Sequence, residues 1–414
     1  MKSTVLSLLG AYIILLVIFV VLMICTYLIP KNAIRDNVID SALIIQKEGQ
    51  YPMFHNLRLT KLDNYTDATM LNIAISTDEE HLLTSAMADY YYYDTINRPE
   101  KAYIVERVAK DDTYGMKRLN YGRYWQGYQV TLRPALCIFG IRGIRILNYI
   151  LLTFLTVVCI WLLWNLVGRV EALMLLISLL VVFFPVVPYS MQYSTCFYLM
   201  FLAMIALIAF PKLTADNRNV MVTFFCIGAI TVFMDFLTTP QLTIGMPLIA
   251  AILVRKPKNA MQWVILAAIA WGMGYALLWA SKWLLGYLLT DFDLLADAME
   301  QVEYRTSHEY NQTDLTIPTV FNYVLFDNSI HSGWIILAVA VVAILVYLWL
   351  QKGWNVQKSY AWLLLIALIV PVWYIIMRQH SVMHRWFTVR AFLVTIYSIL
   401  LWVYYTVCKS PTRR

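Results

Sequence analysis

The chain has 414 residues, of which 61% are hydrophobic and 14% are charged, and its mean hydropathy is +0.64. Soluble domains are about 45–50% apolar and about 25% charged, because they need a charged exterior. The composition therefore excludes a soluble enzyme, a secreted domain, a disordered chain and a nucleic-acid-binding protein. It predicts an all-α polytopic integral membrane protein, in which the placement of the net charge of +7 matters more than its total.

Ten apolar stretches are candidates for crossing about 30 Å of hydrocarbon. They are Val5–Ile29 and residues 146–168, 172–187, 193–210, 220–234, 242–254, 260–282, 333–350, 360–377 and 387–408. The first carries no charge and is too long for a signal-peptide core, so we expect a retained anchor. Three stretches are short and contain or adjoin Pro185, Pro188, Pro240 and Pro247. They predict kinked or half-membrane helices that line a cavity.

The basic residues predict the orientation. With the N-terminus inside, the cytoplasmic segments contain only two acidic residues, Glu171 and Asp216. Their basic residues are Lys2, Arg169, Lys212, Arg218, Arg255, Lys256, Lys258, Lys352, Lys358, Lys409, Arg413 and Arg414. Because Lys and Arg collect on the cytoplasmic side, both termini are predicted to be cytoplasmic. The resulting parts are a first transmembrane helix (1–29), an extracytoplasmic loop domain (30–134), membrane helices (135–282), a second extracytoplasmic loop (283–332), and membrane helices with a cytoplasmic tail (333–414).

The first extracytoplasmic loop is predicted to be mostly helical. Apolar residues at helical spacing begin after Asn37 and stop at Gly49, which indicates a short amphipathic helix on the membrane surface. Thr77–Glu80 has the pattern of a capping box and predicts a helix towards Ala88. Tyr90–Tyr93 follow, either as an aromatic belt at the headgroup level or as a platform for a sugar ring or lipid phosphate.

Two carboxylates in this loop are candidate catalytic groups. If a helix begins near Asp63, then Asp63 and Asp67 are one turn apart and share a face. Such a pair can divide its roles, one acting as general base while the other raises its neighbour's pKa or holds the substrate. The alternative is structural, with Asp63 as helix N-cap and Asp67 as a solvated acid in the first turn.

The segment Tyr121–Tyr128 and the following Arg133 lie where this loop returns to the membrane. The arginines and aromatic rings there can clamp a phosphate and stack against a sugar, or they can anchor the chain at the interface. Arg142 and Arg145 add further positive charge to an otherwise apolar stretch.

Two further groups are candidates. Asp235 lies in the turn between two apolar stretches, where an acid is either functional or satisfied by buried hydrogen bonds. His380 and His384 are four residues apart, but without a third ligand they predict no metal site. Together with Arg385 and Arg390, His384 is a candidate receptor for an anionic headgroup.

The layout resembles the GT-C glycosyltransferases, which are integral membrane enzymes that use polyprenyl-phosphate-linked sugars. The shared features are a multi-span helical chain, a large first outer loop that starts with a membrane-surface helix, acids in that loop and arginines at outer span ends. The phrases Asp63-Asn-Tyr-Thr-Asp67-Ala and Arg123-Tyr-Trp-Gln-Gly-Tyr128, with Arg133-Pro134, are similar to those of uncharacterised bacterial members. One departure is that many of these enzymes carry the catalytic acid soon after the first span, whereas Asp63 lies well beyond Ile29.

This resemblance implies transfer of a sugar from a polyprenyl-phosphate donor to a glycan, lipid or protein acceptor on the outer face of a bacterial plasma membrane. The implied catalytic acids are Asp63, Asp67 and Asp235, the last positioning the acceptor or a divalent cation, which is the only cofactor implied. The implied donor-phosphate site is Arg123, Arg133, His384, Arg385 and Arg390, and the implied sugar-stacking rings are Tyr124 and Trp125. The partners are the bilayer, the donor and the acceptor, with no nucleic acid.

A transporter or flippase for a lipid-linked or anionic solute would use the same arginines and broken helices without covalent chemistry. Transporters usually place their key polar groups near the midplane, whereas the charges of this chain gather at the outer rim. That distribution favours an enzyme. A scaffold or polymerase-like ligase of envelope assembly would share the same surface.

Overall fold

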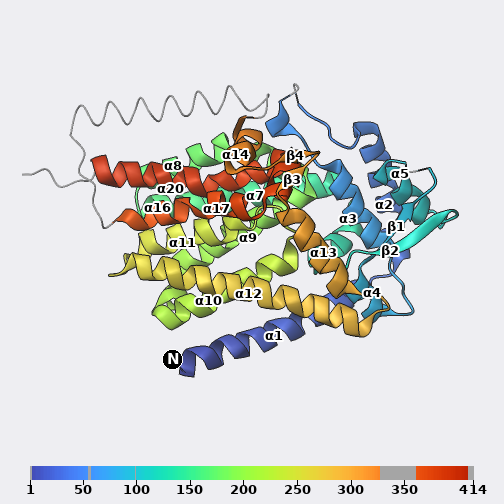
Figure 1. Cartoon of the computed structure of the whole chain (residues 1–414), viewed down its shortest axis with the longest axis horizontal. Helices are drawn as coiled ribbons and strands as arrows, with labels where there is room; N and C mark the ends of the chain where they lie inside the picture. The colour runs from blue at the N-terminus through green and yellow to red at the C-terminus, as the bar shows by residue number, and fades with distance from the viewer. Residues whose placement is uncertain (1, 55–56, 98, 327–359, 409–414) are drawn as a thin grey trace, which may run out of the picture.

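The computed structural model describes residues 2–54, 57–97, 99–326 and 360–408. The long helices lie side by side as a bundle, and residues 30–134 form a domain over one end of it (Figure 1). We call this part the loop domain and that end of the bundle the capped end. The predicted span 333–350 lies outside the described residues.

In the described part of the chain, six segments are long and apolar enough to cross a membrane. They are α1 (Lys2–Tyr27), α7 (Ile141–Leu166), α9 (Met191–Ala209), α10 (Asn217–Met234), α12 (Ala260–Leu289) and the segment Arg385–Thr406. This last segment runs through α19 (Arg385–Thr388), η5 (Val389–Phe392), α20 (Leu393–Val403) and most of η6 (Tyr404–Cys408). The chain is thus a helical protein compatible with insertion in a membrane, as its composition predicts.

The remaining predicted spans are shorter helices. They are α8 (Arg169–Val181), α11 (Gln241–Arg255), α16 (Ala361–Ala367) and α17 (Ile369–Ile376). After α8 the chain turns through the 3-10 helix η2 (Phe184–Tyr189), because Pro185 and Pro188 lack the N–H group that an α-helix needs. Within the described residues, six segments meet the length and composition of a span, so the predicted count of about ten is not confirmed.

The loop domain is built mainly of helices around one antiparallel strand pair. Its elements are α2 (Lys31–Glu48), η1 (Arg58–Thr60), α3 (Asn64–Ile75), α4 (Leu82–Ala88), β1 (Tyr90–Asp94), α5 (Lys101–Ala109), β2 (Met116–Asn120) and α6 (Gln129–Leu136). Strands β1 and β2 pair with Tyr92 opposite Arg118. The second loop adds α13 (Leu294–Thr306), β3 (Glu309–Tyr310), β4 (Thr313–Asp314) and α14 (Ile317–Phe326), and α18 (Arg378–Met383) lies beyond α17. At the opposite end, η3 (Pro211–Thr214) joins α9 to α10.

The structure corrects two local predictions and adds one strand. Helix α2 ends at Gly49 as predicted, but it starts at Lys31, directly after Pro30, and not after Asn37. The capping-box pattern at 77–80 does not start a helix, because α4 begins at Leu82. The tyrosines at 90–93 form strand β1, a conformation that suits aromatic side chains.

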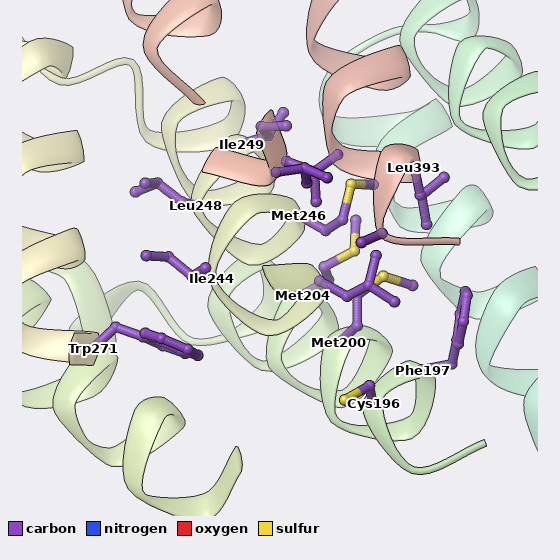
Figure 2. Packing of buried hydrophobic residues seen from close by; sticks show 14 of the residues in the cluster. Cys196, Phe197, Met200, Met204, Ile244, Met246, Leu248, Ile249, Trp271 and Leu393 are labelled. Atoms are coloured by element: carbon purple, nitrogen blue, oxygen red, sulfur yellow. The ribbon is translucent and has the colours of Figure 1, made fainter. Parts of the chain in front are cut away.

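Methionine and phenylalanine side chains fill the core of the bundle. Figure 2 shows Met200 and Met204 of α9 meeting Met246 of α11 and Leu393 of α20. Met side chains adapt to irregular gaps between helices, and all four residues are fully buried. A second apolar cluster lies inside the loop domain, centred on α2, α3 and α5.

Helices α10 and α12 approach each other through glycine. A methyl group on Gly228 of α10 would collide with the carbonyl oxygen of Trp271, and one on Gly274 of α12 with that of Phe225. Small residues at a crossing let two membrane helices pack backbone to backbone. The long helix α12 is thereby fixed against α10 and carries its far end to the loop domain (Figure 1).

Candidate functional site

Asp63 is the N-cap of α3, as one of the two sequence interpretations predicted. Its Oδ1 accepts a hydrogen bond from the backbone N–H of Thr66 at 3.0 Å, and the residue is only 2% exposed. Burial raises the pKa of this carboxyl to about 6, although the Thr66 hydrogen bonds and Lys61 act in the opposite direction. A carboxylate with this pKa can both hold and release a proton near neutral pH.

Aromatic rings surround Asp63. The rings of Tyr51 and Trp386 meet edge to face with centroids 5.6 Å apart, and Tyr65 stacks on Tyr51 at 6.2 Å. The ammonium of Lys61 lies 4.2 Å from the Tyr51 ring centre and 4.0 Å from that of Trp386. Tyr51 and Tyr65 are each more than a third exposed, so the buried carboxylate lies beneath a partly open aromatic surface.

Asp67 joins the loop domain to the bundle. It is fully buried, and its carboxylate accepts hydrogen bonds from the hydroxyl of Ser190 at 3.1 Å and from the backbone N–H groups of Met191 and Gln192 at 3.3 and 3.2 Å. The solvated first-turn acid that the alternative interpretation predicted is therefore wrong, because Asp67 caps α9 rather than facing water. Burial raises its pKa to about 7, while nearby Arg145 lowers it.

Asp235 stabilises a turn. It follows α10, and its two carboxylate oxygens accept from the backbone N–H of Thr238 at 3.2 and 2.9 Å. Burial raises its pKa to about 6. The same turn presents the Leu237 carbonyl oxygen to Nε2 of His380 at 2.8 Å.

The two predicted histidines lie against this turn and are neutral. His380 Nδ1 is 2.6 Å from the guanidinium of Arg305, and the rings of His380 and His384 are 4.9 Å apart. Burial, together with the charge of Arg305, lowers the pKa of both histidines, that of His384 to about 3. At neutral pH His384 therefore supplies no positive charge for the phosphate-binding role that the sequence suggested.

Two of the predicted phosphate-binding arginines bind backbone carbonyls. Arg133 is fully buried and donates to the carbonyl oxygens of Thr26, Ile29 and Ala74. Arg390 is 1% exposed and donates to Trp386 O and Leu59 O, at 2.7 Å each. Both guanidinium groups hold the loop domain and the bundle together, which leaves them little capacity for a ligand.

The other two predicted arginines contact different residues. Arg123 pairs with Asp297 of α13 at 3.1 Å, and its ring neighbour is Tyr121. Arg385 donates to the Val382 carbonyl oxygen at 3.0 Å, with its guanidinium 5.7 Å from the Tyr323 ring centre. The structure therefore does not gather the predicted arginines into one clamp.

The predicted sugar-stacking rings are core residues. Trp125 is fully buried, donates from Nε1 to Leu278 O at 2.7 Å and meets Phe19 edge to face. Tyr124 is 2% exposed and stacks on Trp279. Neither ring offers a face to a sugar in this structure. Tyr51 and Trp386, which are partly exposed beside Asp63, were not singled out from the sequence.

A groove opens next to the segment that carries Asp63. Of this groove, the sequence indicated only the positive charge of Arg142 and Arg145. Its volume is about 640 Å³, and it lies between α7 and the segment that precedes α3. The lining residues are Glu48, Pro52, Phe54, Leu62, Arg142, Arg145, Ile146, Tyr149, Ile150 and Tyr189. Leu62 directly precedes Asp63 in the chain, so the groove borders the segment that carries the carboxylate, although Asp63 itself does not line it.

Among the described residues, no three His, Cys, Asp or Glu side chains converge as a metal site requires. The divalent cation suggested for Asp235 therefore stays a prediction. Comparisons of the chain with models of protein families, with curated proteins and with solved structures gave no match.

Proposed function

We propose that the chain is a glycosyltransferase that moves a sugar from a polyprenyl-phosphate donor to an envelope acceptor at the outer membrane surface, with Asp63 as general base. The observation that carries the proposal is the position of Asp63. It is a buried carboxylate with a pKa of about 6, it lies beneath partly exposed aromatic rings, and the residue before it, Leu62, lines a groove on the bundle's side.

The chemistry requires one proton acceptor and a stabilised leaving group. Asp63 takes the proton of the acceptor hydroxyl as its oxygen bonds to the anomeric carbon of the donor sugar. The bond between that carbon and the donor phosphate oxygen breaks, and the lipid phosphate leaves with the electron pair. Positive charge close to the phosphate lowers the cost of this step, and the protonated Asp63 returns its proton to water.

The proposal gives Asp67 and Asp235 positioning roles. Asp67 fixes the start of α9 against α3, and Asp235 shapes the turn that contacts His380. Both act through the backbone that they hold, so neither needs to touch the substrate. The aromatic surface of Tyr51 and Trp386 suits the apolar face of a sugar ring.

A transporter or flippase is the second candidate, and one observation favours it. At the capped end, α9, α11 and α18 contribute buried side-chain atoms that have no hydrogen-bond partner in the described structure. They belong to Gln192, Gln241, Gln379 and Ser381. Buried polar groups without partners are costly, so they are expected where a polar solute passes or binds.

The test is a transfer assay with the full chain in proteoliposomes and a panel of radiolabelled polyprenyl-phosphate sugars. Asp63→Asn removes the base but keeps a good helix cap, so transfer should fall at least 100-fold with the protein still folded. Asp216→Asn is the matched control, because Asp216 caps α10 in the same way, accepting from Asn219 N at 2.8 Å. Full transfer by Asp63→Asn would refute the assignment, and solute movement without transfer would favour the transporter.

A further inference from the structure

The groove beside Asp63 has a cationic end and an apolar remainder. Arg142, Arg145, Ile146, Tyr149 and Ile150 all line it. Their spacing along α7 puts them on one face of that helix, with both arginines in its first turns. The groove therefore runs lengthwise along a helix that is long and apolar enough to cross a membrane.

Arg145 is a fixed guanidinium. It is 9% exposed, and its Nη1 lies 2.7 Å from the Glu48 carboxylate while Nη2 donates to Asn64 Oδ1 at 2.9 Å. The amide of Asn64 in turn donates to Glu48 at 2.9 Å, so the three side chains hold one another. Buried Nε of Arg145 has no partner among the described residues. This leaves one N–H of an ordered cation unsatisfied beside the groove.

Arg142 supplies the net charge. It is exposed one turn before Arg145, and within the described part of the chain it forms no ion pair or hydrogen bond. Glu48 balances the charge of Arg145, so the groove as a whole carries one uncompensated positive charge from Arg142. An anion is the ligand that this end favours.

The rest of the groove suits a hydrocarbon chain. Ile146, Tyr149 and Ile150 are 61%, 46% and 60% exposed, although they are apolar or aromatic and belong to a candidate membrane span. The rings of Phe54 and Tyr189 form the opposite wall, with their centroids 6.0 Å apart. A site with one charged end and such walls is complementary to an amphiphile.

We propose that this groove binds the phosphate headgroup of an anionic lipid, with Arg142 and Arg145 at the phosphate and the lipid chain along Ile146 and Ile150. The inference deepens the proposed function and rests on it for one point, the identification of this lipid as the sugar donor. Asn64, which bonds Arg145, follows Asp63 directly in the chain. A phosphate held here would bring the donor sugar close to the segment that carries the proposed general base.

The first experiment measures binding alone. The detergent-purified full chain is titrated with a polyprenyl phosphate that carries a fluorophore on its tail, with phosphatidic acid, phosphatidylglycerol, phosphatidylcholine and inorganic phosphate as unlabelled competitors. We expect the two anionic lipids to compete and phosphatidylcholine not to. Competition by inorganic phosphate at equal concentration would identify a free-phosphate site and overturn the lipid assignment.

Variants locate the site. Arg142→Gln should raise Kd about tenfold or more, because a charge-assisted contact is lost, and Ile150→Trp should do the same by filling the groove. Lys117→Gln, an exposed cation on β2, is the matched control and should bind as the wild type does. Unchanged Kd in both Arg142→Gln and Ile150→Trp would overturn the inference.

Transfer measurements on the same variants separate the two proposals. If Arg142→Gln and Ile150→Trp both bind the lipid normally while Asp63→Asn loses transfer, the groove assignment fails and the proposed function stands. If Arg142→Gln loses binding but no variant or wild type transfers any sugar, the groove stands as a lipid site and the proposed function fails. Loss of binding and of transfer together in Arg142→Gln supports both.

Discussion

Asp89 and Lys282 form an ion pair that is completely removed from solvent, with 2.9 Å between Oδ2 and Nζ. Asp89 ends α4 in the loop domain, and Lys282 belongs to α12 of the bundle. Each charged group of the pair has a further hydrogen-bond partner. Tyr27 donates to Oδ1 of Asp89 at 2.8 Å, and Lys282 also donates to Ala86 O. These contacts tie α1, α4 and α12 together.

Removing one charge of this pair is predicted to lower the free energy of unfolding more than removing both charges. Asp89→Asn leaves a buried ammonium without its counter-charge, so we expect a loss of about 3–5 kcal/mol in the free energy of unfolding. Asp89→Asn combined with Lys282→Met removes both charges and should cost clearly less than the sum of the single variants. Thermal unfolding of the detergent-purified proteins measures the cycle, and strict additivity would contradict the coupling.

Arg133 is predicted to be a structural residue rather than a phosphate ligand. Arg133→Gln leaves buried carbonyl oxygens without donors, and we expect destabilisation of about 2–4 kcal/mol by thermal unfolding. Arg118→Gln is a suitable control because its pair with Asp78 is partly exposed and should contribute less than about 1 kcal/mol. An Arg133→Gln protein with unchanged stability but weakened donor binding would restore the interpretation made from sequence.

The pH dependence of transfer is predicted to follow Asp63. A general base acts only when it is ionised, so kcat/KM should fall as pH decreases through about 6 and level off above it. Because burial is the main cause of this raised pKa, Tyr51→Ala should admit water and move the acidic limb to lower pH. Asp67→Asn, which removes the other nearby carboxyl, should leave the limb in place. A limb that disappears in Asp67→Asn instead would transfer the role of base to that residue.

The apolar pattern predicted the bundle well where helices are long. The predicted stretches 193–210 and 220–234 correspond to α9 and α10 within a few residues, because long apolar runs have few alternative structures. The start of α7 was placed too late, at 146. An arginine near the start of an apolar stretch usually indicates the boundary of a span. Arg145 nevertheless lies within α7, where it pairs with Glu48 of α2.

Only the local contacts of the site could be predicted from the sequence. The capping role of Asp63 follows from its spacing to Thr66, and the structure confirms it. The role of Asp67 depends on Ser190, 123 residues further along the chain, and no local pattern encodes that contact. In the sequence, Arg133 and Arg390 cannot be distinguished from phosphate-binding arginines. Their acceptors are backbone carbonyl oxygens, which every residue has, so the sequence does not reveal them. The pairing of Tyr51 with Trp386 is hidden for the same reason.

The exposed rings beside Asp63 are predicted to bind the acceptor sugar. Stacking on an aromatic ring contributes about 1 kcal/mol, so Tyr51→Ala should raise the KM for the acceptor about fivefold with a smaller change in kcat. Trp386→Phe keeps a ring next to Tyr51 and should lie between Trp386→Ala and the wild type. Tyr114→Ala is the matched control, because Tyr114 is a 90% exposed tyrosine in the loop domain and forms no part of the surface around Asp63. Steady-state transfer kinetics at saturating donor measure these effects. If Tyr51→Ala and Tyr114→Ala have the same KM as the wild type, the aromatic surface does not bind the acceptor and serves only to bury Asp63.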